Sequence, residues 1–146
     1  MNRVQSIGVG LLGLGVVGMG VAQVLLNNKN WLHSRIGASL DLRKVLVKNL
    51  SKSRELSLAD GVLTDNPDDL LGDEEIDLVV EVMGGDEPAA GYIHRALVGG
   101  KDVVTANKEV IAKFGPELLE AAQSYRKSLL FEGSVGAGIP IIGPLT

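Results

Sequence analysis

One glycine-rich run without charged residues constrains the fold of this chain more than any other feature. It extends from Val4 to Asn28 and contains GLLGLGVVGMG at residues 10–20. An uncharged apolar run of about 18 or more residues is typical of a membrane span, and a short one can be a targeting segment. Gly-x-x-x-Gly spacing also suits the close packing of two helices. The third interpretation is a dinucleotide-binding turn, because the glycines at 13, 15 and 18 have the required Gly-x-Gly-x-x-Gly spacing.

The glycines themselves argue against a membrane span or a targeting segment. Each glycine weakens a helix by roughly 1 kcal/mol relative to alanine, and the run has glycines at 8, 10, 13, 15, 18 and 20. The residues that follow, NNKN at 27–30, offer no small-residue cleavage site. We therefore expect no membrane association and a cytoplasmic protein.

The composition excludes several classes of partner and chemistry. The net charge is −4 and aromatic residues make up 3% of the chain, which disfavours a nucleic-acid-binding surface. There is no cysteine, so disulfides, thiolate metal sites and cysteine nucleophiles are excluded within this sequence. With 146 residues, the chain has the length of about one domain.

Strand and helix patterns alternate along the chain. This alternation predicts an α/β fold, a Rossmann-like doubly wound and mostly parallel sheet with helices on both faces. We expect the first helix to bury Val17, Val21, Val24 and Leu25, which share one face at helical spacing. The expected strands are 6–12, 42–48, a short one within 60–65, 76–85, 101–106 and 128–133. The expected helices are 16–28, a turn opened by Asn66-Pro67, 86–100 with acidic residues in its first turn, and 107–127 with a break near Gly115-Pro116; 29–40 is a polar connection or a helical extension.

The context of the glycine motif strengthens the dinucleotide interpretation. The motif follows an expected strand and precedes an expected helix. In such a turn Gly13 permits the tight bend, Gly15 lets the backbone approach a pyrophosphate, and Gly18 lets the helix pack closely on the strand. The helix N-terminus then faces the anion. A glycine-rich turn without any ligand is the alternative.

The end of the second expected strand bears on the type of nucleotide. An acidic residue there would bind a ribose 2′-hydroxyl, whereas a basic one accommodates a 2′-phosphate. Here Lys48 and Asn49 occupy that position, and Arg54 follows. We therefore expect NADP(H) to be favoured, with NAD(H) as the alternative.

Four sequence blocks together resemble the N-terminal part of homoserine dehydrogenase. They are GLGVVGMG at 13–20, EVMGGDEPA at 81–89, GKDVVTANK at 100–108 and FEGSVGAGIPII at 131–142. The resemblance covers essentially the whole chain and rests most specifically on the last two blocks. It implies that residues 1–146 are an NAD(P)-binding domain, the front part of a longer enzyme whose C-terminal catalytic and dimerisation domain is absent here.

The resemblance also implies a reaction and the residues that serve it. Such enzymes interconvert L-homoserine and L-aspartate 4-semialdehyde with a nicotinamide cofactor. Lys108 would be a catalytic candidate for proton transfer, while the main acid–base lysine would lie beyond Thr146, so this chain alone is expected to be inactive. The implied cofactor-binding residues are Gly13, Leu14, Gly15, Val16, Val17 and Gly18 at the pyrophosphate, Lys48, Asn49 and Arg54 near the adenosine, and Met83, Gly84, Gly85, Thr105, Asn107 and Lys108 towards the nicotinamide.

In relatives, the EGSVGAGIP segment binds a monovalent cation, typically sodium, mostly through backbone carbonyls. The matching positions are Glu132, Val135, Ala137 and Ile139. Such a site would be structural. The resemblance further implies a small-molecule substrate and a homodimeric or homotetrameric full-length enzyme.

Two other functions stay open at the level of the sequence. One is the front domain of another semialdehyde or amino-acid dehydrogenase. The other is a nucleotide-sensing regulatory domain, which would need the glycine turn but has no evident use for the VVTANK and EGSVGAGIP segments.

Overall fold

A sheet of six parallel strands forms the centre of the computed structural model, which describes residues 5–131. The strands lie in the order β3-β2-β1-β4-β5-β6. From β1 the chain therefore builds outward through β2 and β3, then crosses back and builds the other half of the sheet. Their bounds are β1 Gln5–Leu12, β2 Ala38–Leu46, β3 Leu63–Thr64, β4 Leu78–Glu81, β5 Asp102–Thr105 and β6 Leu129–Leu130.

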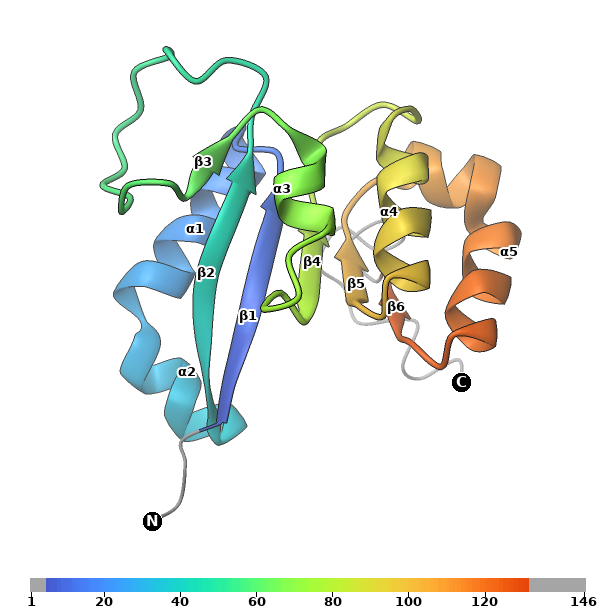
Figure 1. Cartoon of the computed structure of the whole chain (residues 1–146), viewed down its shortest axis with the longest axis horizontal. Coiled ribbons are helices and arrows are strands. Elements are labelled where there is room, and N and C mark those ends of the chain that lie inside the picture. The colour runs from blue at the N-terminus through green and yellow to red at the C-terminus, as the bar shows by residue number, and fades with distance from the viewer. Residues whose placement is uncertain (1–4, 132–146) are drawn as a thin grey trace.

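Helices cover both faces of the sheet, as the alternating pattern predicted. α1 and α2 lie behind β1 and β2 in Figure 1, and α3 lies in front of the sheet. One apolar core joins the sheet to α3, α4 and α5, and a second, smaller core joins it to α1. The helices are α1 Val16–Asn27, α2 Lys29–Ile36, α3 Pro67–Leu71, α4 Ala89–Val98 and α5 Lys108–Ser124.

The uncharged run is explained by the central position of β1. Successive residues of a strand point to opposite faces, and here Leu11 joins the core under α1 while Leu12 joins the core under the other helices. Both are fully buried. A strand covered on two faces reads as a continuous apolar run. No helix in the described range is long and apolar enough to cross a membrane.

The buried face of α1 differs from the predicted one. Its buried residues are Gly18, Ala22 and Leu25, whereas Val17 and Val24 are largely exposed. The prediction was right for Leu25, and Val21 packs partly buried against the smaller core, but it was wrong for Val17 and Val24 because it weighed apolar character alone. A helix that packs this closely on a strand places its smallest residues in the contact.

Several expected boundaries also moved. The strand expected at 76–85 ends at Glu81, so 82–85 form a loop, and the last strand is limited to Leu129–Leu130. β2 begins at Ala38 instead of Leu42, after α2 has extended the first helical region. α5 runs unbroken through Pro116, an exposed residue on the solvent side of the helix, where water can satisfy the carbonyl one turn earlier. α4 begins at Ala89, so Asp86 and Glu87 precede its first turn.

Candidate functional site

The carboxyl ends of the strands meet at one edge of the sheet, where the strand order reverses between β1 and β4. Open α/β sheets bind ligands at such a point. A cleft of about 470 Å³ lies there. It is lined from three sides, by the turn after β1, the segment after β2 and the loop after β4 up to α4. The lining residues are Gly13, Leu14, Gly15, Leu46, Val47, Lys48, Asn49, Lys52, Arg54, Asp65, Val82, Met83, Gly84, Glu87, Pro88 and Tyr92.

Each of the three motif glycines has a different structural environment. Gly13 has φ +100°, a conformation that other residues rarely adopt. A Cβ on Gly18 would lie 2.2 Å from the carbonyl oxygen of Gly13, so only glycine lets α1 approach this turn. Gly15 lines the cleft, and a Cβ on it would meet nothing within 4 Å. No protein contact requires glycine at this position, which is the pattern expected where a ligand approaches the backbone.

The N-terminus of α1 is suited to binding an anion. Gly15 is its N-cap and provides no side-chain cap, and the first turn contains no acidic residue. The positive end of the helix dipole and the amides of the first turn therefore border the cleft without an acidic side chain on α1 itself, while Asp65 and Glu87 line other parts of the cleft. Val16 and Val17 begin the helix and are exposed, whereas Gly18 is buried against the turn.

The segment after β2 supplies the basic side of the cleft. Lys48 and Lys52 line the cleft as exposed side chains. The Arg54 guanidinium donates to the carbonyl oxygens of Lys52 and Asn49, each at 2.8 Å, so it also holds this segment in place. The Asn49 side chain accepts from the amide of Ser51 at 2.9 Å.

The opposite wall is the loop after β4. Met83 and Gly84 line the cleft, and Gly84 and Gly85 both have positive φ, 79° and 72°. Asn107 is buried under this loop and donates to the carbonyl oxygen of Gly85 at 2.6 Å. Its side-chain oxygen also accepts from the amide of Val110 and so caps α5. Gly85, Thr105, Asn107 and Lys108 are therefore behind or beside the cleft wall and do not line it.

The sequence did not lead us to predict one residue that supports this wall from behind. Glu81 ends β4, is fully buried, and accepts hydrogen bonds from Thr105, Met83 and Asn107. The signal was available, because a glutamate closes the otherwise apolar stretch LVVE at 78–81. The sequence also did not lead us to predict Glu87, Pro88 and Tyr92, which reach the cleft only because α4 starts beside it.

Lys108 begins α5 as an exposed residue, directly after the Asn107 cap. Further along α5, Lys113 forms an ion pair with Asp86, which lies in the loop between β4 and α4. The hydrogen bond from Lys113, the amide of Glu87 and the charge of Lys113 hold the pKa of Asp86 below its usual value. The same hydrogen bond and charge raise the pKa of Lys113. This pair ties the loop to α5 at neutral pH.

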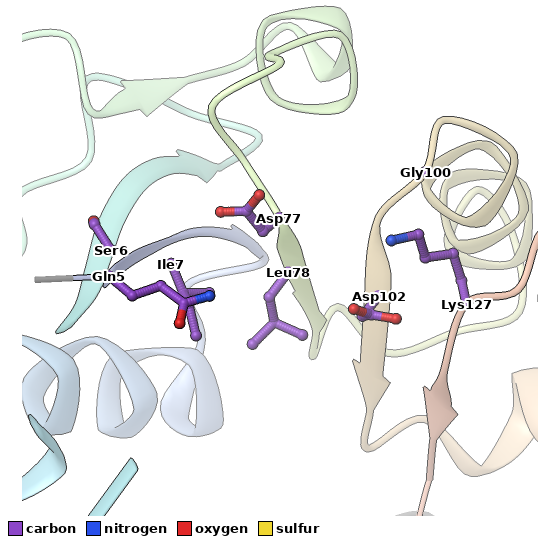
Figure 2. A pocket seen from close by; sticks show the side chains of 8 residues that line it. All are labelled: Gln5, Ser6, Ile7, Asp77, Leu78, Gly100, Asp102 and Lys127. Atoms are coloured by element: carbon purple, nitrogen blue, oxygen red, sulfur yellow. The ribbon is translucent and has the colours of Figure 1, made fainter. Parts of the chain in front are cut away.

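A second cleft, of about 400 Å³, lies at the opposite edge of the sheet, among the amino ends of β1, β4 and β5. Figure 2 shows Gln5, Ile7 and Leu78 on one side of it and Asp102 and Lys127 on the other. Its two carboxylates accept hydrogen bonds from backbone amides. Asp77 accepts from the amide of Gly8 at 2.9 Å, and Asp102 accepts from the amide of Ser128 at 2.8 Å. Gly100 is the one glycine among its lining residues and no helix N-terminus borders it, so the cleft at the carboxyl edge is the better candidate for a nucleotide site.

The residues predicted to hold a cation, Glu132, Val135, Ala137 and Ile139, lie outside the described residues. Within residues 5–131, no cluster of three or more histidine, aspartate or glutamate side chains could hold a metal ion.

The strand order, the glycine turn and the cleft at the reversal point together define a Rossmann-type dinucleotide-binding domain. The family model of the homoserine dehydrogenase NAD-binding domain matches residues 13–132. The chain belongs to this family, which confirms both the predicted fold and the resemblance seen in the sequence.

Named relatives agree with this assignment. The homoserine dehydrogenase of Bacillus subtilis is 43% identical over 142 residues, and that of Synechocystis is 42% identical over 140 residues. These matches cover 97% and 96% of this chain, but only 33% and 32% of those enzymes. The chain thus spans about a third of the length of the curated relatives it matches.

Solved structures show the same relation. A homoserine dehydrogenase from Thiobacillus denitrificans superposes with a TM-score of 0.87 at 45% identity, over 97% of this chain and 33% of that one. A homoserine dehydrogenase from S. aureus superposes with a TM-score of 0.85 at 34% identity, over 91% of this chain and 33% of that one.

Proposed function

We propose that this chain is the cofactor-binding part of an enzyme that interconverts L-homoserine and L-aspartate 4-semialdehyde, a step in the biosynthesis of threonine, methionine and isoleucine. The observation that carries the proposal is the glycine-lined cleft at the strand reversal of a chain that belongs to this family. The bound nicotinamide would supply the hydride chemistry. The described residues bind and orient that cofactor.

Each wall of the cleft has a separate task in this proposal. The turn from Gly13 to Gly18 receives the pyrophosphate at the start of α1, where Gly15 leaves the backbone open. Lys48 and its neighbours receive the adenosine end. The loop of Met83, Gly84 and Gly85 borders the nicotinamide end, with Thr105 and Asn107 behind it.

Lys108 is proposed as a residue for proton transfer at the reacting centre. It is exposed at the start of α5, next to the residues that support the nicotinamide-side loop. The helix dipole disfavours a cation at a helix N-terminus, so a lysine here is better explained by a ligand than by helix stability. The substrate groups and the main acid–base lysine are proposed to lie outside this chain, which would then bind cofactor without turnover.

The proposed preference is for NADP(H). Lys48 lies two residues after the end of β2, in the place where an acidic residue would favour NAD(H), and Lys52 adds a second positive charge to the same cleft. A charge-assisted contact with a 2′-phosphate is worth more than one with a neutral hydroxyl.

Titration of the chain with NADPH and NADH, followed by nucleotide fluorescence, tests this proposal. We expect NADPH to bind more tightly, and Lys48→Asp to weaken NADPH binding by about tenfold or more with little loss for NADH. Lys29→Asp makes the same charge change on α2, remote from the cleft, and should alter neither affinity. If neither nucleotide binds the wild-type chain, the cofactor-binding function is wrong; if Lys48→Asp affects both equally, the preference is wrong.

The remaining features of the proposal rest on the family resemblance. They are a structural sodium ion at Glu132, Val135, Ala137 and Ile139, a homodimeric or homotetrameric enzyme, and a cytoplasmic location. The regulatory-domain alternative predicts nucleotide binding too, so it is separated by assaying a longer protein that contains this chain for aspartate-semialdehyde reduction.

A further inference from the structure

Glu81 is the only buried acid among the residues that the structure describes. It ends β4 with 0% exposure. Burying a carboxylate costs free energy unless hydrogen bonds replace its hydration. None of the ion pairs within residues 5–131 includes Glu81. The compensation therefore comes from neutral donors, and these donors indicate what the carboxylate does.

The two carboxylate oxygens of Glu81 accept hydrogen bonds from the loop after β4 and from residues at and after the end of β5. Oε2 accepts from the Thr105 hydroxyl at 2.5 Å. Oε1 accepts from the Met83 amide at 2.8 Å and from Nδ2 of Asn107 at 3.4 Å. The backbone carbonyl of Glu81 accepts from the amide of Ala106 at 3.2 Å. One residue thus joins the loop after β4 to the segment after β5.

The loop that Glu81 holds is tied to α5 at Asp86 by the ion pair with Lys113, whereas Gly84 and Gly85 before it have few restraints. Gly84 and Gly85 have no side chains to pack, and nothing lies within 4 Å of the Cβ positions they lack. The loop is fixed at Met83 by Glu81, and at Gly85 by Asn107, whose Nδ2 contacts both Gly85 and Glu81. Met83 and Gly84 form part of the cleft wall. The geometry of that wall therefore depends on a carboxylate that does not itself line the cleft.

We propose that Glu81 is a positioning residue, whose buried carboxylate sets the Met83–Gly85 loop for the nicotinamide half of the cofactor. This inference rests on the proposed function, because it assigns a support to one half of the same site. The adenosine half, at Lys48 on the far side of the turn, shares none of these hydrogen bonds. Loss of the carboxylate should therefore affect one half of the nucleotide and spare the other.

The test compares Glu81→Gln with the wild-type chain for two ligands. One is the whole dinucleotide that the wild type binds better. The other is its adenosine half, adenosine 2′,5′-bisphosphate for NADPH or ADP for NADH. We expect Glu81→Gln to weaken dinucleotide binding by about tenfold, because an amide cannot accept from all three donors. Binding of the adenosine half should stay within about twofold of wild type. Glu117→Gln, an exposed α5 substitution with the same charge change, should alter neither.

Each other outcome overturns the inference. Unchanged binding of both ligands would mean that the loop does not depend on the carboxylate. An equal loss for both would mean that Glu81 only stabilises the fold. A wild-type chain that binds neither ligand would instead refute the proposed function, a result distinct from the other two.

Thr105 provides an independent variant in case Glu81→Gln does not fold. Thr105→Ser keeps the hydroxyl that donates to Glu81, whereas Thr105→Val removes it. We expect Thr105→Val to weaken the dinucleotide selectively and Thr105→Ser to restore its binding. Equal affinities for the two variants would contradict the role given to Glu81.

Discussion

At the scale of single residues, two glycines of one turn serve different purposes. A methyl group on Gly18 would overlap the carbonyl oxygen of Gly13, whereas one on Gly15, which lines the cleft, would meet nothing within 4 Å. Gly18 is therefore required by the fold. We expect Gly15 to serve ligand binding instead, and the two roles become measurable when folding and binding are followed separately.

We expect Gly18→Ala to destabilise the chain by about 2 kcal/mol or more, since overpacking forces the helix from the strand. Gly15→Ala should leave the free energy of unfolding nearly unchanged but weaken nucleotide binding at least about tenfold. Urea denaturation measures the first quantity and fluorescence titration the second. Gly20→Ala is the control: it is exposed on α1 with nothing near its Cβ position, so it should retain both properties. A Gly15→Ala variant that binds like wild type would refute the backbone approach at this glycine.

At the scale of secondary-structure elements, a buried lysine links two connecting segments at the edge of the sheet where the strands begin. Lys101 immediately precedes β5, and its Nζ donates to the carbonyl oxygens of Asp73 and Ile76, at 2.6 and 2.8 Å, in the segment between α3 and β4. Burial lowers the pKa of Lys101, and the charges of Asp73, Asp77 and Glu74 partly oppose this shift. The interaction fixes the start of β4 relative to β5 at the edge of the sheet opposite the glycine-lined cleft.

Lys101→Met should reduce the free energy of unfolding by about 1–3 kcal/mol at neutral pH, because two buried carbonyls lose their donor. The lowered pKa also predicts a pH dependence. Between this pKa and the higher one of the unfolded chain, the unfolded state binds more protons, so wild-type stability rises with pH. The variant should lack this rise. Urea denaturation from pH 7 to the alkaline range measures both effects, with Lys29→Met as an exposed control; equal curves for wild type and Lys101→Met would contradict the prediction.

At the scale of the whole molecule, the cleft joins the two halves of the sheet. The turn after β1 and the segment after β2 contribute one side, and the loop after β4 contributes the other (Figure 1). A ligand that bridges them binds only the folded chain. Binding should therefore be linked to global stability.

We expect the preferred nucleotide, at about one hundred times its dissociation constant, to raise the melting temperature by roughly 5–10 °C. A thermal scan over a nucleotide concentration series measures the shift, which should grow with the logarithm of concentration at saturation. Gly15→Ala should lose most of the shift at the same concentration. A melting temperature that does not depend on nucleotide would contradict binding in this cleft.

Local signals in the sequence predicted much of this fold and part of the site. The glycine turn between a strand and a helix, the alternation of elements and the family blocks are all read within a few residues, because strand and helix periodicities and turn conformations are local. They predicted the parallel sheet and placed Gly13, Gly15, Lys48, Asn49, Arg54, Met83 and Gly84 around what proved to be one cleft.

Other features depend on which elements cover each other, and only the tertiary structure decided them. α1 turns its glycine and alanine to the sheet because Gly13 and Gly18 are in near contact, a distance that helical periodicity does not encode. Glu81 is buried because Thr105 and Asn107, more than twenty residues later, are brought beside it by strand pairing. The sequence alone thus determined the kind of fold and the glycine turn that lines the cleft. The structure determined which buried groups hold the opposite wall, since the donors that make a buried carboxylate stable come together only when the strands do.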